Sequence, residues 1–168
     1  MHISVRGIVE KDDGIILIHR IKPREDGTLR DYFVVPGGKK EEGESNLETL
    51  NREIEEELGI TVDVKEKLIE YDDQAYNDSI QIFYICTHKD GIIGTGNGPE
   101  MTNKNEYKGI FEPVVVKYED LKNVNLVPEA IKDLLVERYE EIKNEKKINI
   151  SFIGFLFCLF ICRLCICS

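Results

Sequence analysis

The sequence predicts an α/β fold in which helices cover both faces of a mixed β-sheet. Short segments rich in β-branched residues, or alternating apolar and polar residues, lie on both sides of residue 50. Amphipathic helical patterns cover residues 45–58 and the stretch after residue 128. Each helix needs an apolar surface to lie on, so the sheet is expected between them.

The first strands are predicted from the order of the segments. Residues 3–9 alternate, Asp12, Asp13 and Gly14 mark a turn, and residues 15–18 form an apolar run, which together indicate a hairpin. Residues 32–35 form a short strand that ends at Pro36. Two glycines follow Pro36 and allow the backbone to bend tightly toward a ligand.

The helix at residues 45–58 has a signal at each end. Ser45 and Glu48 match a capping box, and Gly59 stands where a left-handed C-cap is expected. One apolar stripe is predicted to pack on the sheet: Leu47, Leu50, Ile54 and Leu58.

Three acidic residues share one face of this helix. Glu53, Glu56 and Glu57 are three or four positions apart, Thr49 shares their face, and we expect no basic side chain there. Carboxylates so close repel one another unless a cation lies among them, and carboxylate oxygens suit Mg²⁺ or Mn²⁺. A solvated acidic helix face is the alternative.

A longer pattern surrounds these carboxylates, Gly-x5-Glu-x7-Arg-Glu-U-x-Glu-Glu-x-Gly-U, where U is a bulky apolar residue. Its specified positions are Gly38, Glu44, Arg52, Glu53, Ile54, Glu56, Glu57, Gly59 and Ile60. The pattern resembles the signature of the Nudix hydrolases, the MutT-like family that cleaves nucleoside diphosphates linked to another group. With the flanking strands and the closing helix, the resemblance covers about residues 1–145 and implies a Nudix-type α/β/α sandwich.

The resemblance implies Mg²⁺-dependent hydrolysis of a phosphoanhydride in a nucleoside di- or triphosphate or a nucleoside diphosphate derivative. The implied metal ligands are Glu53, Glu56, Glu57 and the main chain of Gly38, with Mn²⁺ as the alternative ion. Glu53 is also the first candidate for the general base, and activation of the water by the metal is the alternative. Arg52 and Glu44 would orient the acidic cluster. A nucleotide-sensing module that does not cleave, or a domain that uses the helix only for packing, are the competing hypotheses.

Residues outside the signature are candidates for substrate binding. Arg20, together with Lys22, Arg24 and Arg30, forms either a phosphate-steering rim in a loop or ordinary surface charge. Three tyrosines could stack a base or simply pack in the sheet: Tyr71, Tyr76 and Tyr84. Two glutamates could supply a further carboxylate or stay at the surface: Glu100 and Glu106. Residues 91–100 are predicted to be a mobile loop bordering the substrate.

The later elements are predicted from similar patterns. Residues 62–70 and 79–87 alternate and indicate strands, residues 114–116 form a buried strand, and Pro128 fits the first position of the last helix. The apolar face of that helix is predicted from Ile131, Leu134, Leu135, Tyr139 and Ile142.

Composition bounds the partners and the compartment. The 168 residues carry a net charge of -10, which argues against binding a nucleic-acid backbone but not against a free nucleotide bound with Mg²⁺. Only Cys86 lies in the body of the chain, so no disulfide framework is expected and the cytoplasm is the expected compartment.

The segment 148–168 differs from the rest and is predicted to lie outside a Nudix domain at residues 1–147. It is almost continuously apolar, with Arg163 as an interruption, and it reaches the ~20 residues of a membrane span only by including that arginine. A C-terminal membrane anchor, a thiolate metal site, translated sequence foreign to the domain and a disordered segment are the open alternatives. The remaining cysteines all lie here: Cys158, Cys162, Cys165 and Cys167.

Overall fold

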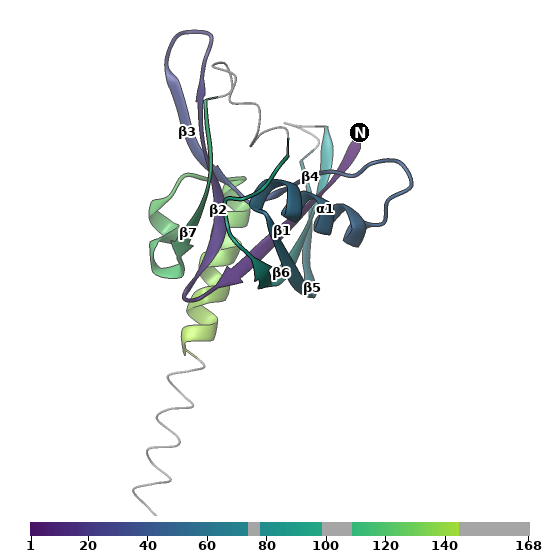
Figure 1. Ribbon diagram of the computed structural model, residues 1–168. Helices are drawn as coiled ribbons and strands as arrows, with labels where there is room; N and C mark the ends of the chain where they lie inside the picture. Colours follow the sequence, from purple (N-terminus) through teal and green to yellow (C-terminus); the bar gives the residue numbers. More distant parts are fainter. Residues whose placement is uncertain (74–77, 99–108, 145–168) are drawn as a thin grey trace, which may run out of the picture. The chain divides into compact units, whose positions relative to one another are not determined.

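The computed structural model describes residues 1–73, 78–98 and 109–144 (Figure 1). The first half of the chain contains β1 (His2–Lys11), β2 (Gly14–Pro23), β3 (Leu29–Val34), β4 (Gly37–Lys39) and α1 (Asn46–Leu58). The second half contains β5 (Ile60–Asp72), β6 (Ser79–Gly91), β7 (Ile110–Lys117), the 3-10 helix η1 (Tyr118–Asn123), β8 (Leu126–Val127) and a last helix described over 129–144.

The strands form one mixed sheet, as predicted. Its order is β5-β6-β1-β2-β3-β8, with β4 pairing with β1 and β7 pairing with β2. The β1–β6 and β3–β8 pairs are parallel, and the other pairs are antiparallel. Along one edge, β1 pairs with β4 at Ser4–Arg6 and with β2 at Val9–Lys11. Between these pairings, the Gly7 N–H donates to the carbonyl of Pro36 at 2.9 Å.

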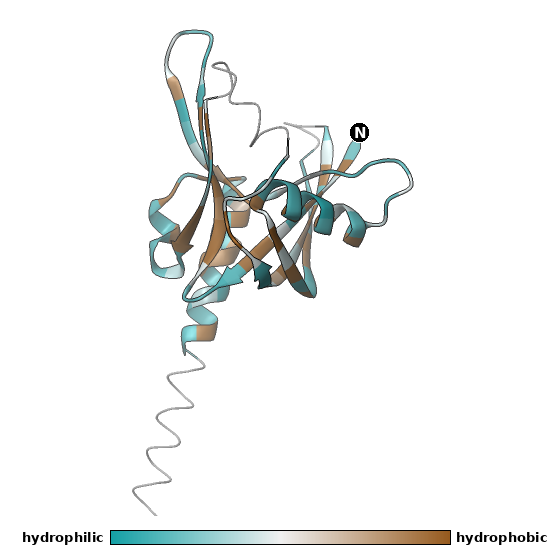
Figure 2. Ribbon diagram, viewed as in Figure 1, coloured by the Kyte–Doolittle hydropathy of each residue, from teal (hydrophilic) through white to brown (hydrophobic). Residues whose placement is uncertain are grey.

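Helix α1 packs on β1, β4 and β5. A Cβ atom on Gly7 would lie 3.0 Å from Ile54 Cδ1 and 3.1 Å from Leu50 Cδ1, so the helix approaches β1 closely. Leu50, Ile54 and Leu58 are fully buried, and Figure 2 shows the strands beneath α1 as largely hydrophobic. The prediction for Leu47 is wrong: it is 47% exposed, because it lies in the first turn of the helix, at the edge of the contact.

Both predicted caps of α1 are confirmed. Ser45 and Glu48 exchange the hydrogen bonds of a capping box, and Gly59 has a left-handed φ of 73°. The described part of the loop predicted at residues 91–100 is hydrogen-bonded to the end of α1. The Gly94 N–H donates to the Leu58 carbonyl and the Gly98 N–H to the Glu56 carbonyl, each at 2.9 Å. These bonds satisfy helix carbonyls that would otherwise lack partners.

Several elements differ from the predictions. Strand β2 continues through residues 19–23, so Arg20 and Lys22 lie on β2 and Arg30 on β3 rather than in a loop. Strands β4 and β8 and the 3-10 helix η1 were not predicted, because each is too short to show a periodic pattern of apolar residues. Pro128 lies just before the helix, and its carbonyl accepts from the Ile131 N–H at 3.1 Å.

The chain divides into two compact units, Met1–Lys132 and Asp133–Ser168. Within the described ranges, no helix is long and apolar enough to cross a membrane. Tyr76, Glu100, Glu106 and the segment 148–168 lie outside the described residues, so their predicted roles stay predictions. The boundary predicted at residue 147 also lies there.

Candidate functional site

The turn between β3 and β4 and the two glycines that begin β4, together called the glycine turn, meet the acidic face of α1. The Gly37 N–H donates to Glu57 Oε2 at 2.7 Å. A Cβ atom on Gly38 would lie 2.5–2.6 Å from the carboxylate atoms of Glu53, so this carboxylate rests against the Gly38 backbone. Gly37 has φ 128°, a conformation that L side chains rarely adopt. Two of the predicted metal ligands therefore converge on the predicted glycine turn.

The Arg52 side chain bridges Glu44, in the loop before α1, and two glutamates of the helix, Glu53 and Glu56. Its Nε and Nη2 donate to the two carboxylate oxygens of Glu44 at 2.7 and 3.0 Å. Its Nη1 donates to Glu53 at 2.8 Å and to Glu56 at 3.3 Å. The prediction that no basic side chain shares the acidic face is therefore wrong. Arg52 lies four positions before Glu56, and its side chain is long enough to reach along the helix.

These contacts shift the pKa values of the pair. The hydrogen bond from Arg52, followed by that from the Glu41 N–H, lowers the pKa of Glu44 from 4.5 to about 2. The bond to Glu44 raises the pKa of Arg52 above its ordinary value, and Glu53 adds to this effect. Thr49, which is fully buried, donates its hydroxyl to Glu44 Oε2 at 2.8 Å. Glu44 is thus fixed as a carboxylate that anchors Arg52.

Arg6 is a contact residue of this site that the sequence analysis missed. Its Nη1 donates to the carbonyls of Val35 and Gly37 at 2.8 and 3.1 Å, and its Nε donates to Gln81 Oε1 at 2.5 Å. Gln81 in turn donates to Asp73 Oδ2 at 2.6 Å. Burial lowers the pKa of Arg6, and the charges of Glu57 and Glu53 oppose that shift. The available sequence signal was an arginine in the middle of the predicted strand at residues 3–9.

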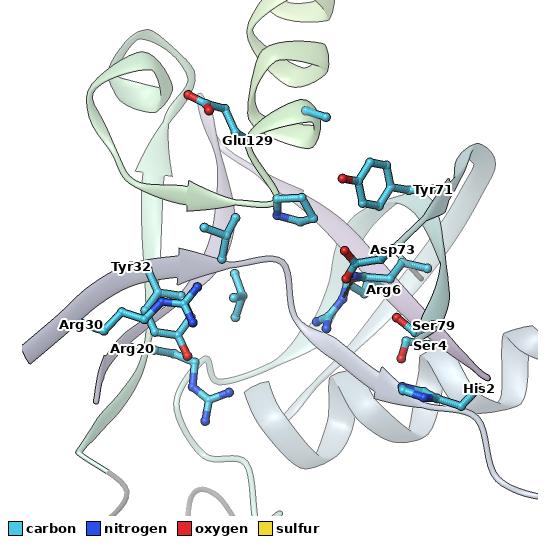
Figure 3. Close-up of a pocket in the computed structure, with 15 residues that line it drawn as sticks. His2, Ser4, Arg6, Arg20, Arg30, Tyr32, Tyr71, Asp73, Ser79 and Glu129 are labelled. Atoms are coloured by element: carbon cyan, nitrogen blue, oxygen red, sulfur yellow. Dashed lines mark hydrogen bonds between the residues drawn. The ribbon is translucent and has the colours of Figure 1, made fainter. Parts of the chain in front are cut away.

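A pocket of about 810 Å³ lies beside Arg6 (Figure 3). Figure 3 shows Arg20, Arg30 and Tyr32 on one side of the pocket and Arg6 and Asp73 on the other. Other lining residues come from β1, β5, β6, the residue before the last helix and the first residue of that helix: His2, Ser4, Tyr71, Ser79, Gln81, Pro128 and Glu129. The predicted candidates Arg20 and Tyr71 thus share a cavity.

The arginines on one side of the pocket lie against aromatic rings. The Arg20 guanidinium is 5.1 Å from the Phe111 ring centre, and that of Arg30 is 4.4 Å from the Tyr32 ring centre. Arg20 Nε is buried and has no hydrogen-bond partner among the described residues. Tyr84, another predicted candidate, packs against the hydrophobic core beneath α1. His19 lies within β2, stacks on Phe33 and contacts Asp31 at 2.8 Å.

Comparison with models of protein families shows to which family the chain belongs. The model of the NUDIX domain matches residues 1–138. The chain belongs to the Nudix family. This confirms the resemblance on which the α/β/α prediction rested.

Individual Nudix proteins are also similar to the chain. An ADP-ribose pyrophosphatase of Methanocaldococcus jannaschii is 41% identical over 66 residues, which are 39% of this chain and 37% of that relative. A solved MutT structure, described for Aliivibrio salmonicida and Vibrio cholerae, is 27% identical with a TM-score of 0.59, covering 82% of this chain and 98% of that one. An ADP-ribose pyrophosphatase of Streptococcus suis shares the fold at 18% identity, with a TM-score of 0.57 over 82% and 90% of the two chains.

The donor set of this Nudix site fits a divalent cation. Glu53 and Glu57 both reach the glycine turn, and Glu56 shares their side of α1. Carboxylate oxygens such as these are the ligands that hard divalent cations prefer. In residues 1–73, 78–98 and 109–144, no group of three acidic, histidine or cysteine side chains lies close enough together to coordinate a metal ion. The contacts give the reason, because Glu53 and Glu56 are both turned toward Arg52.

Proposed function

We propose that this Nudix protein hydrolyses a phosphoanhydride in a nucleoside di- or triphosphate or a nucleoside diphosphate derivative, with Mg²⁺ as the ion and Mn²⁺ as the alternative. The observation that carries the proposal is the convergence of Glu53 and Glu57 on the Gly37–Gly38 turn. The similarity to an ADP-ribose pyrophosphatase over 66 residues supports a small-molecule nucleotide substrate. The net charge of -10 and the free, buried thiol of Cys86 agree with a cytoplasmic protein that does not bind nucleic-acid backbones.

Glu53, Glu56, Glu57 and the main chain of Gly38 would hold the ion. When bound, it would supply positive charge that neutralises the diphosphate oxygens and the negative charge that develops on them during the reaction. Water attacks phosphorus, the bond from phosphorus to the bridging oxygen breaks, and the leaving phosphate keeps the bonding electrons. Glu53, 14% exposed and resting against Gly38, takes the proton of the attacking water. Arg52, held by Glu44, keeps Glu53 oriented for this transfer.

The pocket in Figure 3 would bind the part of the substrate beyond the cleaved bond. Arg20 is the proposed anion contact, because its buried Nε has no partner among the described residues and its guanidinium faces a cavity. Arg30 and Tyr32 add a cation and an aromatic face to the same side. Tyr76 and Glu100 remain predicted substrate contacts outside the described residues.

A hydrolysis screen tests the proposal. ADP-ribose, nucleoside triphosphates, nucleotide sugars and dinucleoside polyphosphates are incubated with the protein, with Mg²⁺ or with a chelator, and the products are separated by chromatography. We expect Mg²⁺-dependent release of a nucleoside monophosphate or of pyrophosphate from at least one class. Binding of nucleotides without cleavage in either condition would favour the nucleotide-sensing alternative.

A further inference from the structure

Arg6 lies between the pocket and the acidic face of α1, and neither the signature nor the proposed mechanism uses it. We infer that Arg6 is a positioning residue that fixes the glycine turn against the metal ligands and links this turn, through Gln81, to the substrate pocket. The inference rests on the proposed function and adds a connection between its two parts.

Residues of β1 hold the glycine turn through three consecutive carbonyls. The Arg6 side chain donates to those of Val35 and Gly37, and the Gly7 N–H donates to that of Pro36. The N–H of Gly37 then donates to Glu57. Gly37 therefore connects Arg6, which binds its carbonyl, to the predicted metal ligand Glu57, which accepts from its N–H. Loss of the Arg6 bonds would free the turn to move, and Glu57 and Gly38 would move with it.

The shape of the guanidinium matters more than its charge. One nitrogen of the planar group serves two carbonyls while another serves Gln81, a geometry that an ammonium group cannot reproduce. The charge alone would act in the opposite direction, because a cation beside Glu53 and Glu57 repels a metal ion. Loss of Arg6 should therefore weaken metal binding if the residue acts through positioning, and should strengthen metal binding if its charge dominates.

The hydrogen bonds that run from the glycine turn through Arg6 end at Asp73, in the pocket. Arg6 and Asp73 line it (Figure 3), as does Gln81. Gln81 accepts from Arg6 and donates to Asp73. Gln81 and Asp73 are 4% and 3% exposed, so little solvent competes for these bonds. A substrate group with N–H or O–H donors, such as a sugar hydroxyl, could bind the Asp73 carboxylate from the cavity. Its contact would reach the turn through Gln81 and Arg6.

The test measures Mn²⁺ affinity of the full chain by calorimetry or electron paramagnetic resonance, without substrate. Arg6→Lys keeps the charge and loses the fork, and Arg6→Met loses both. We expect each to weaken Mn²⁺ binding by about tenfold or more, as outer-shell changes commonly do. Unchanged affinity in Arg6→Lys, or tighter binding in Arg6→Met, would overturn the positioning role. Lys65→Met, at an exposed position of β5, is the matched control and should bind as the wild type does.

Gln81→Met tests the link to the pocket and also serves if the Arg6 variants do not fold, which circular dichroism reports. It leaves the Arg6 bonds to the carbonyls available and breaks the connection to Asp73. We expect a several-fold loss of Mn²⁺ affinity, smaller than in Arg6→Lys. Wild-type affinity in Gln81→Met would overturn the link. Failure of the wild-type protein itself to bind Mn²⁺ would instead count against the proposed function.

Discussion

The guanidinium of Arg52 binds both oxygens of the Glu44 carboxylate, at 2.7 and 3.0 Å, and contacts Glu53 at 2.8 Å on its other side. It also donates to the carbonyl of Lys39 at 3.1 Å. Arg52 therefore joins the loop before α1, the strand after the glycine turn and the acidic face of the helix. This geometry assigns Arg52 to orienting Glu53 rather than to contact with substrate.

Arg52→Lys should lower kcat by about 10–100-fold while the fold is retained. Lysine keeps the positive charge, but its ammonium group cannot bind both oxygens of Glu44 and Glu53 at the same time. Steady-state kinetics with the substrate found in the screen would measure the effect, and circular dichroism would check the fold. A kcat equal to that of the wild type would show that the charge alone suffices.

The stability contributed by Glu44 should depend on pH in a defined window. Its pKa is 4.5 ordinarily and about 2 when folded, chiefly because Arg52 donates to it, so the folded state binds this proton less tightly than the unfolded state. The stabilisation is therefore complete above about pH 4.5 and is lost as pH falls toward about 2. Urea unfolding of the wild type and of Glu44→Gln should show a gap at pH 7 that closes across this window. A gap that stays constant from pH 6 to pH 2.5 would contradict the assignment.

Glu57→Gln should remove most activity without unfolding the protein. The amide oxygen can still accept the Gly37 N–H, so the turn stays in place while the negative charge is lost. We expect kcat to fall by more than the ~100-fold upper range of outer-shell changes, because a proposed metal ligand is altered. Glu55→Gln is the matched control, since Glu55 is exposed on the same helix. Near-normal turnover in Glu57→Gln would refute its role as a ligand.

Gly38→Ala should impair activity more than stability. The new methyl group would meet the Glu53 carboxylate at 2.5–2.6 Å, and this flexible side chain must move away. We expect kcat to fall by about tenfold or more, by analogy with other changes that displace metal-site residues, with little change in the melting temperature. Gly27→Ala should behave in the opposite way, because Gly27 has φ 80° and open space around it. There the strain should cost about 1 kcal/mol of stability and leave kcat unchanged.

Local features of the fold were predictable from the sequence, whereas long-range contacts were not. The caps of α1 depend on residues three or four positions apart, and both were found as predicted. Arg6 and Gln81 are 75 positions apart and meet only because β1 pairs with β6 in parallel, a register that no local pattern specifies. Arg52 was missed on the acidic face because helical spacing gives the direction of a Cβ atom but not the reach of a long side chain.

Arg20→Met should raise KM with little change in kcat. Arg20 lines the pocket and lies on Phe111, and its Nε has no hydrogen-bond partner among the described residues, so its loss should leave the fold stable. A contact made equally in the bound substrate and in the transition state affects KM alone. We expect KM to rise by about tenfold, which corresponds to the ~1.4 kcal/mol of a hydrogen bond to a charged group. Initial rates across substrate concentrations would measure both constants. A lower kcat at unchanged KM would place Arg20 in the reaction itself and would contradict its assignment to the pocket.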